Sequence, residues 1–288
     1  MAVPKKYKKK KTAPQIVEAQ QPVNQIHKKP VSKLLLASII AIFSFLLYAN
    51  TLGHNYTVDD VTVITSNKIV QKGVDGIGEI FSTPYRKGYW DRNENMYRPL
   101  SVVMFALEWE MAPNKPWLGH LMNVLLYSLT GFLIFYALAG LLNNYKNHLA
   151  IAFASAMLFA AHPIHTEVVA NIKSRDEILA LLFCVLSGFS FVKYFDINKI
   201  GWLIISIFSF ALALFSKENA ITFLVIFPLT VYFFRNNSIK RNIIFSSLFI
   251  IPVVLYFAVR YSVLNHLGAH EQVMLINNSL AGAPGYAS

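Results

Sequence analysis

The chain has 288 residues, of which 55% are hydrophobic and only 14% are charged, whereas a soluble domain averages about 25% charged residues. This deficit, with a mean hydropathy of +0.44, excludes an ordinary soluble domain and predicts a chain dissolved mainly in lipid. The net charge of +11 does not indicate a nucleic-acid partner, because many of the lysines lie in a tail that directly precedes the first apolar stretch.

Residues 1–33 are predicted to form a basic, disordered tail that lies on anionic lipid at the cytoplasmic face. Seven stretches without Asp, Glu, Lys or Arg follow it, and a spanning helix needs about 20 residues. These stretches cover residues 34–58, 116–145, 147–166, 178–192, 200–216, 219–234 and 242–259. The fourth and sixth are short, but flanking Lys and Arg can reach the interface. The sequence therefore predicts an all-α integral membrane bundle of about seven transmembrane helices.

A cytoplasmic N-terminus gives short cytoplasmic connections at Lys146, 193–199 and 235–241, which hold six Lys or Arg and one acid, Asp196. This agrees with the positive-inside rule, which counts only basic residues. The opposite side then receives 13 of the 15 acids. Because the acids did not set the orientation, their segregation predicts a polar, functional non-cytoplasmic face.

Four external segments build this face. The first external loop, 51–115, is long, and a short helix on the membrane surface is predicted over 100–107 because Pro99 suits a helix start. The second segment, 162–177, is dense in polar groups, and the third is little more than 216–219. The last, 261–288, is expected to be incomplete.

Asp59 and Asp60 follow the first span almost immediately. In an extended segment, neighbouring side chains point to opposite sides, so that one carboxylate would face a substrate while the other held a loop or an ion. A carboxylate beside a low-dielectric surface suits a general base. The alternative is a solvated acidic turn at a helix end.

Three further polar clusters lie on the same face. His162, His165 and Glu167 offer three potential metal ligands, or else form a capping turn around Pro163. Lys173 and Arg175 are candidates for binding a phosphate, or helix-entry charges. Lys217 and Glu218 interrupt two apolar stretches, which is costly near membrane depth unless they are paired or functional. Arg98 adds a further cation before the surface helix.

In order along the chain, these motifs resemble the membrane domain of the transmembrane and tetratricopeptide-repeat O-mannosyltransferases and their bacterial relatives. The residues that carry the resemblance are Asp59-Asp60, Tyr97 to Ser101, Gly119 to Leu126, His162 to Ala170, Ser174 to Glu177 and Ser216 to Ala220. The resemblance covers about 34–288 and implies a GT-C glycosyltransferase fold. Such enzymes transfer a sugar, here a hexose such as mannose, from a polyprenyl-phosphate carrier to a hydroxyl of a protein or glycan, with inversion.

The resemblance implies that Asp59 or Asp60 is the general base. Arg98, His162, His165, Glu167, Lys173, Arg175, Lys217 and Glu218 are the candidates for binding the substrate or its phosphate. No cofactor is certain, although a divalent cation remains a candidate. Relatives continue into further spans and tetratricopeptide repeats, so that 34–288 is expected to be a partial, C-terminally truncated domain.

Two other functions remain open from the sequence, a flippase or transporter for lipid-linked sugars and a non-catalytic membrane scaffold. A transporter needs polar or charged residues along a path inside its spans, whereas this chain has its charges at helix ends. The composition, rich in Lys, Asn and Ile, favours a bacterial cytoplasmic membrane with a periplasmic active face. The alternative location is an endoplasmic reticulum membrane with a lumenal active face.

Overall fold

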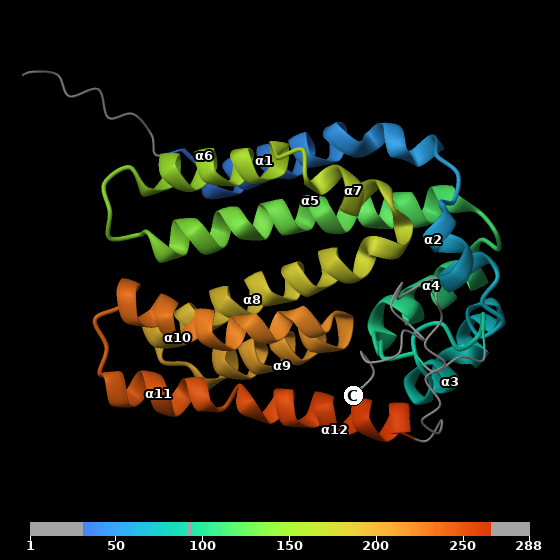
Figure 1. Ribbon diagram of the computed structural model, residues 1–288. Helices are drawn as coiled ribbons and strands as arrows, with labels where there is room; N and C mark the ends of the chain where they lie inside the picture. The colour runs from blue at the N-terminus through green and yellow to red at the C-terminus, as the bar shows by residue number, and fades with distance from the viewer. Residues whose placement is uncertain (1–30, 91–93, 266–288) are drawn as a thin grey trace, which may run out of the picture. The chain divides into compact units, whose positions relative to one another are not determined.

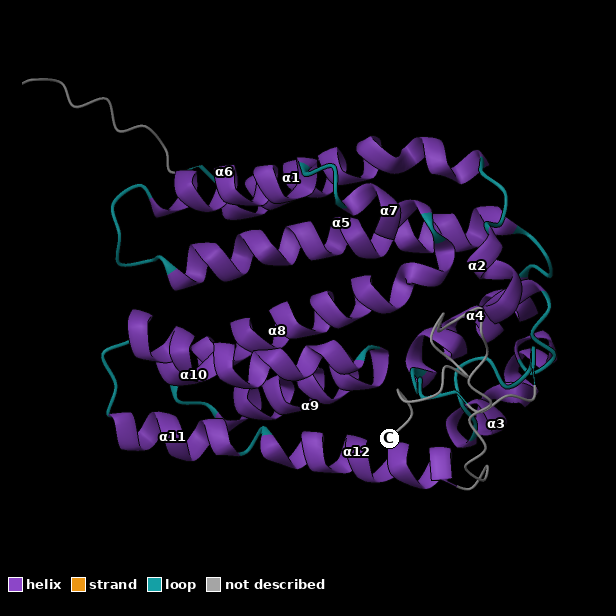
Figure 2. Cartoon of the chain, in the orientation of Figure 1, coloured by secondary structure: helices purple, strands orange, loops and turns teal. Residues whose placement is uncertain are grey.

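The computed structural model describes residues 31–90 and 94–265. Residues 1–30 of the predicted disordered tail and most of the last predicted external segment lie outside the described residues, as do Asp91 and Glu271. Lys33, the last residue of that predicted tail, begins the first helix. Within the described ranges every regular element is helical and none is a strand (Figure 2). The prediction of an all-α membrane protein is confirmed.

Eight helices run roughly along a common direction (Figure 1). They are α1 (Lys33–Tyr48), α5 (Pro116–Leu141), α6 (His148–Ala161), α8 (Arg175–Ile197), α9 (Ile200–Ser216), α10 (Phe223–Phe234), α11 (Ile239–Ser247) and α12 (Ile250–Asn265). Helices α1, α5 and α6 pack together, and α8 packs between α5 and α9. Helices α11 and α12 follow each other closely, and α12 packs against α9.

Four helical stretches of the described chain are long and apolar enough to cross a membrane, namely Lys33–Gly53, Pro116–Leu141, Ile172–Ile197 and Ile239–Asn265. Three shorter apolar helices, His148–Ala161, Ile200–Ser216 and Glu218–Phe234, accompany them. The fourth predicted span is therefore longer than its uncharged core, because its helix continues through charged residues at both ends. The third is short because α6 ends just before Pro163. The total of seven spans stays a prediction.

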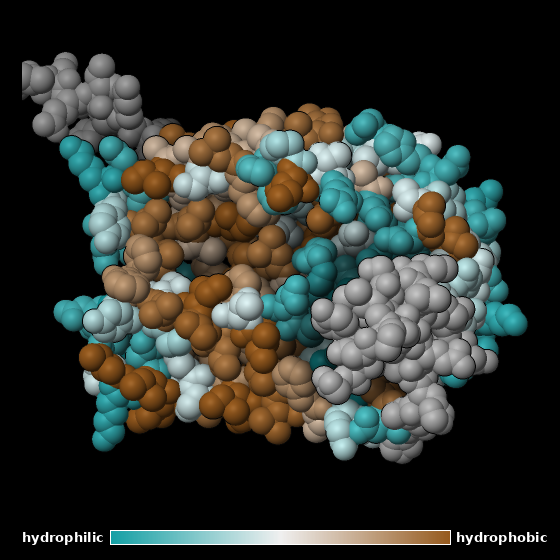
Figure 3. Space-filling model, in the orientation of Figure 1, coloured by the Kyte–Doolittle hydropathy of each residue, from teal (hydrophilic) through white to brown (hydrophobic). Residues whose placement is uncertain are grey.

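The distribution of hydrophobic and hydrophilic residues over the surface is that of a membrane protein. Hydrophobic residues form a band across the middle of the helices, and hydrophilic residues gather at their two ends (Figure 3). Many large apolar side chains of these helices are exposed, among them Ile204 and Phe208 of α9 and Leu158 of α6. Apolar surface of this extent on a helical bundle marks contact with lipid.

The segments that were predicted to be external contain short helices and single turns at one end of the bundle (Figure 1). They are η1 (Ala49–Gly53), α2 (Val58–Asp60), the π turn η2 (Val61–Thr65), η3 (Val70–Gly76), α3 (Ile77–Ser82), α4 (Pro99–Met111), α7 (His165–Ala170), η4 (Ile172–Ser174) and η5 (Glu218–Thr222). The predicted helix after Pro99 is present, and proline occupies its first turn. It packs against η3 and α3 and touches α8 and α9, so that it closes the outer end of the bundle.

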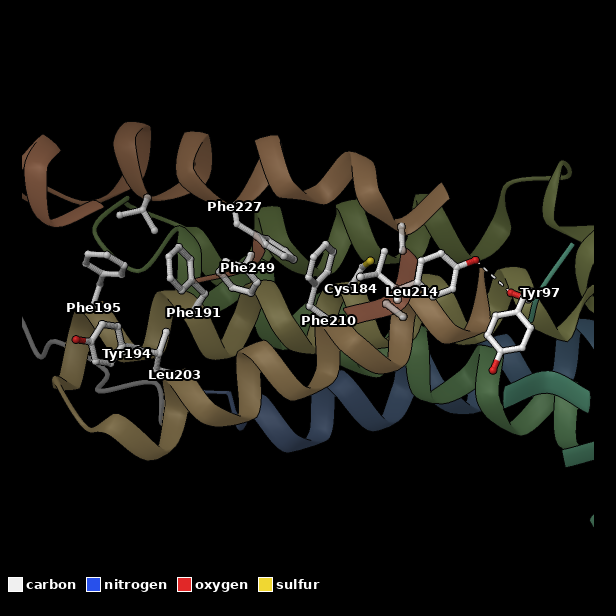
Figure 4. Packing of buried hydrophobic residues seen from close by; sticks show 14 residues of the cluster. Tyr97, Cys184, Phe191, Tyr194, Phe195, Leu203, Phe210, Leu214, Phe227 and Phe249 are labelled. Carbon is white, nitrogen blue, oxygen red and sulfur yellow. Dashed lines mark hydrogen bonds between the residues drawn. The ribbon is translucent and has the colours of Figure 1, made fainter. Parts of the chain in front are cut away.

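An aromatic core joins α8 to α12 (Figure 4). Phe249 lies 5.0 Å from Phe191, 5.4 Å from Phe210 and 4.8 Å from Phe227, measured between ring centroids. Contacts at these distances and at steep interplanar angles add to the dispersion that holds lipid-embedded helices together. At the outer end, the Tyr256 hydroxyl donates a hydrogen bond of 3.1 Å to the carbonyl oxygen of Tyr97, which links α12 to the first external loop.

Two buried serines join α8 to α9. The Ser187 hydroxyl donates to the carbonyl oxygen of Ser206 at 2.8 Å, and the Ser206 hydroxyl donates to that of Ser187 at 2.7 Å. Small polar residues of this kind let membrane helices approach closely and satisfy their own hydrogen bonds. The position of α8, and of the site at its outer end, is therefore fixed on the α9 side.

Candidate functional site

Arg175 begins α8 and is completely buried. Its Nε donates to Asn123 Oδ1 at 2.8 Å, one terminal nitrogen donates to the Gly119 carbonyl oxygen at 2.9 Å, and the other pairs with Glu108. The guanidinium carbon lies 4.7 Å from the centroid of the Phe105 ring. Each of the three guanidinium nitrogens contacts a protein acceptor, and the side chain has no exposed surface, so Arg175 is not available to a phosphate and connects α4, α5 and α8 instead.

Gly119 allows η4 to pack close to α5, next to the contacts of Arg175. A Cβ atom at Gly119 would lie 2.8 Å from the Ile172 side chain, a distance that packed atoms do not adopt. Burial raises the pKa of Glu108, and the positive charge of Arg175 opposes that shift. The carboxylate is therefore costly to bury without its arginine.

The guanidinium of Arg98, the residue before α4, is likewise held by protein partners. Its Nε and one terminal nitrogen donate to the two carboxylate oxygens of Glu218 at 3.0 and 2.6 Å, and the other terminal nitrogen donates to Asp176 at 2.7 Å. Burial alone would lower the pKa of Arg98, but the hydrogen bonds and charges of Glu218 and Asp176 raise it further above its usual range. This buried triad ties the first external loop to the start of α8 and to η5.

The two adjacent aspartates have different surroundings. Asp60 is completely buried; one carboxylate oxygen accepts from the backbone and hydroxyl of Thr57 at 2.8 and 3.0 Å, and the other accepts from the backbone N–H of Lys173 at 2.7 Å. Asp59 is exposed, and its carboxylate accepts no hydrogen bond from the described residues. Asp60 thus fastens α2 to η4, while the Asp59 carboxylate stays available.

The expectation of an extended segment here is wrong. Both aspartates lie in the single helical turn α2, where Thr57 and Asp60 form a reciprocal cap. Successive residues of a helix point about 100° apart, which is enough to bury one carboxylate and expose its neighbour. The capped turn therefore gives the two carboxylates the different surroundings that were expected of an extended segment.

The segment 162–167 comprises the turn after α6 and the first residues of α7. His162 and Glu167 are exposed, and the Nδ1 atom of His162 accepts from the backbone N–H of Ile164 at 3.3 Å. His165 is half-buried, and its Nδ1 atom lies 2.9 Å from the Tyr127 hydroxyl. Among the described residues no three His, Cys, Asp or Glu side chains are placed to hold a metal ion. The geometry favours the capping turn over the three-ligand metal site.

A cavity of about 340 Å³ opens between α5, α7, α8 and η5. Its polar end is formed by His165, Glu177, Lys217 and Asn219, and the remainder is lined mostly by apolar side chains. Lys217 pairs there with Glu177, and the Lys217 side chain is 12% exposed. This end is called the polar mouth below.

A second, apolar cavity of about 240 Å³ lies farther along the same helices, between α5, α8 and α10. Cys184 and Phe223 line both cavities, so the two are adjoining parts of one groove. None of the side chains that line the second cavity is charged. The groove is thus polar at its outer end and apolar along the rest of its length.

The structure divides the predicted site residues into four groups. Arg98, Arg175 and Glu218 belong to buried ion pairs, His165 and Lys217 line the polar mouth, and Asp59, His162 and Glu167 are exposed outside the groove. Asp60 and Lys173 connect α2 to η4 through a backbone hydrogen bond, and the Lys173 ammonium makes no ion pair within residues 31–90 and 94–265. Asp59 does not line the groove.

Four residues of the site were not predicted as such from the sequence. Asn123 and Glu108 hold Arg175, Tyr127 holds His165, and Cys184 joins the two cavities. Asn123 and its neighbour Gly119 both lie in the Gly-His-Leu-x-Asn motif that carries the family resemblance, which is the one signal that could have singled them out. Glu108, Tyr127 and Cys184 stand out only once the helices are packed.

The sequence profile of the dolichyl-phosphate-mannose-protein mannosyltransferases matches residues 99–264, which include the groove and both partners of the Arg175–Glu108 pair. The chain belongs to this family. It is 32% identical to protein O-mannosyl-transferase TMTC1 of Mus musculus over 65% of the present chain and 21% of that protein. A protein O-mannosyl-transferase of Caenorhabditis elegans is 30% identical over 72% of the chain and 29% of its own length. The tmtc2 protein of Xenopus laevis is 30% identical over 75% of the chain and 26% of its own length.

These matches confirm the predicted membership of the transmembrane and tetratricopeptide-repeat branch of the mannosyltransferase family. The chain spans between about a fifth and three tenths of the length of these relatives. No solved structure shows a significant match. The geometry of the groove and of the aspartate turn therefore comes from this chain alone.

Proposed function

We propose that the protein is a glycosyltransferase that moves a sugar from a polyprenyl phosphate to a hydroxyl group of a protein on the non-cytoplasmic side of the membrane. Mannose is the sugar that the names of the relatives favour. The observation that carries the proposal is the groove, which combines an apolar inner part with a polar mouth whose cation, Lys217, is paired with Glu177.

The apolar length suits the isoprenoid tail of the carrier. Its lining on α8 runs from Glu177 to Val192, which is about 22 Å along a helix axis. A transporter would need charged or polar groups along such a path, and the lining of the inner cavity has none that is charged. This distribution favours a site that holds a lipid over one that moves a polar headgroup across the membrane.

Lys217 is the cation best placed to bind the carrier phosphate. It lines the polar mouth and pairs with Glu177, whose side chain is 45% exposed and free to move aside. A phosphate entering the mouth would exchange one anionic partner of Lys217 for another, without leaving the ammonium unpaired. Lys173, on η4 just before α8, supplies a second cation, whereas Arg98 and Arg175 are fully engaged elsewhere.

Asp59 is the general base of the proposed reaction. Its carboxylate takes the proton from the acceptor hydroxyl, the hydroxyl oxygen forms a bond to the anomeric carbon, and the bond from that carbon to the phosphate oxygen breaks. The polyprenyl phosphate leaves with the bonding electron pair, and the configuration at the anomeric carbon inverts. General base catalysis contributes roughly 10²–10⁴-fold to such a rate.

The test compares two isosteric variants of the full protein in membranes supplied with polyprenyl-phosphate mannose. Asp59→Asn should reduce transfer by roughly 10²–10⁴-fold and leave thermal unfolding unchanged, because the exposed carboxylate has no partner among the described residues. Asp60→Asn should lower the unfolding temperature, because it weakens a buried carboxylate with three hydrogen bonds. Undiminished transfer by Asp59→Asn would remove the proposed base, and wild-type protein that binds the carrier without transferring sugar would favour the scaffold or the transporter.

A further inference from the structure

His165 lies in the polar mouth, and its hydrogen bonds fix which of its ring nitrogens carries the proton. The Tyr127 hydroxyl oxygen lies 3.0 Å from the Ala160 carbonyl oxygen, 3.4 Å from that of Phe159 and 2.9 Å from His165 Nδ1. Carbonyl oxygens only accept, and the hydroxyl has a single proton. The proton must therefore point to the carbonyl oxygens at the end of α6, since otherwise oxygen lone pairs would face each other at 3.0 Å.

Once the tyrosine proton is assigned, the hydroxyl oxygen can only accept from the histidine, so Nδ1 of His165 carries the hydrogen. In the neutral imidazole the other nitrogen then has a free lone pair. Nε2 makes no hydrogen bond with the described residues. It is also accessible, because it is not among the buried nitrogens without a hydrogen-bond partner in the described part of the chain, whereas both ring nitrogens of His120 are. Nε2 is the atom left to meet an occupant of the cavity that His165 lines.

A neutral Nε2 is an acceptor, and this excludes the phosphate as its partner. Phosphate oxygens offer lone pairs and would repel it, whereas they suit the Lys217 ammonium in the same mouth. The sugar of the donor is bonded directly to that phosphate, so it occupies the space next to Lys217, and its hydroxyl groups are hydrogen-bond donors. The chemistry of the two side chains thus separates the mouth into a phosphate position and a hydroxyl position.

We propose that Nε2 of His165 accepts a hydrogen bond from a hydroxyl group of the transferred sugar, and that His165 is a specificity residue of the donor site. The inference rests on the proposed function for the identity of the ligand. The sequence had suggested His165 as a residue that binds substrate or phosphate, and the tautomer narrows that role to a hydroxyl. A site that offers one hydrogen-bond acceptor to a substrate hydroxyl discriminates against ligands that lack that hydroxyl.

Charges around the ring are consistent with a neutral imidazole. His162 lies 5.8 Å away between ring centroids, the Phe159 ring packs at 4.4 Å, and Glu177 and Lys217 line the same cavity as an ion pair. Burial lowers the pKa of His165, and the charge of His162 lowers it further, while a hydrogen bond to Phe159 opposes the shift. The lone pair is therefore present at neutral pH.

The test measures transfer from polyprenyl-phosphate mannose and from its single-deoxy analogues by the full protein and two matched variants. His165→Asn keeps a polar atom near Nδ1 for Tyr127 and removes Nε2, whereas His165→Gln keeps an acceptor near the Nε2 position. Wild type should reject one deoxy donor by roughly 5- to 150-fold, His165→Asn should lose that discrimination, and His165→Gln should retain part of it.

Equal discrimination in wild type and His165→Asn would overturn the proposal, as would a variant that changes only the affinity for the acceptor. Failure of the proposed function is a separate result, because wild type would then transfer no sugar from any donor. An independent measurement is the ¹⁵N spectrum of the histidine rings at pH 7, with His165→Asn used to assign the signal. A neutral ring protonated on Nδ1 is expected, and an Nε2–H tautomer or an imidazolium would refute the assignment whether or not the variants fold.

Discussion

Replacing Arg175 by methionine is the sharpest test of the buried ion pairs at the outer end of the bundle. Methionine has a similar length but cannot donate hydrogen bonds, so Glu108, Asn123 and the Gly119 carbonyl oxygen would all lose their partner. Arg175 has no exposed surface, and the Glu108 side chain is only 14% exposed. Removing one partner of such a pair costs about 3–5 kcal/mol, because the remaining charge is buried alone.

The measurement is the free energy of unfolding in mixed micelles, with the exposed pair of Lys72 and Glu79 as a matched control. Their side chains are 50% and 40% exposed, so Lys72→Met should cost no more than about 1 kcal/mol. The double variant Arg175→Met, Glu108→Gln should recover part of the loss, because no charge is then left unpaired. A loss below about 1 kcal/mol in Arg175→Met would refute the reasoning from burial.

The pH dependence of this variant has a defined sign. Without Arg175, burial raises the pKa of Glu108 with nothing to oppose it. A folded-state pKa above the unfolded value means that the folded protein binds the proton more tightly, so the stabilisation is present at low pH and is lost as the pH rises through the folded-state pKa. The difference in stability between Arg175→Met and wild type should therefore shrink as the pH falls from 7 to 5.

Two further predictions concern the groove and the end of the bundle opposite the polar mouth. Cys184→Trp should raise the KM for long-chain carriers at least tenfold and hardly affect the KM for water-soluble short-chain donors, because Cys184 lies where the two cavities meet. Cys184→Ser is the control, and an equal effect on both donors would contradict a continuous groove. Arg235→Gln should lower the free energy of unfolding by about 1.5–3 kcal/mol, because the arginine donates to the carbonyl oxygens of Gly140 and Leu141 at the end of α5. An unchanged denaturation midpoint would show that these hydrogen bonds do not stabilise the helix end.

The spans could be predicted because lipid excludes charge. Each of the first six uncharged stretches corresponds to one main helix, and the seventh is divided between α11 and α12. Proline marks the start of two helices, at Pro99 and Pro116. Helix ends were less predictable where charge continues inside the protein. The fourth stretch appeared short because Arg175 and Asp176 were taken as boundary residues, whereas both lie inside α8 and are buried by partners from other helices.

The roles of the cations could not be predicted, because they depend on partners far away in the chain. Arg175 pairs with a carboxylate 67 residues away, and Arg98 with one 120 residues away. A sequence shows that Arg98, Arg175 and Lys217 lie near one membrane face, but not which of them already has its charge neutralised. Similarly, adjacency of Asp59 and Asp60 could not show that a capped turn buries only the second.

The buried pairs and the proposed chemistry have a common physical basis. A phosphate can be held only by a cation whose present partner is cheap to displace. The guanidinium of Arg98 is buried, and its bidentate bonds to Glu218, whose side chain is 28% exposed, are expensive to break. Lys217 meets the opposite condition, because its partner Glu177 is 45% exposed and regains water when it moves aside. The arginines therefore fix α4, α8 and η5 around the polar mouth, and the rigidity that they supply would let one lysine and one histidine lone pair distinguish the phosphate of the proposed donor from its sugar.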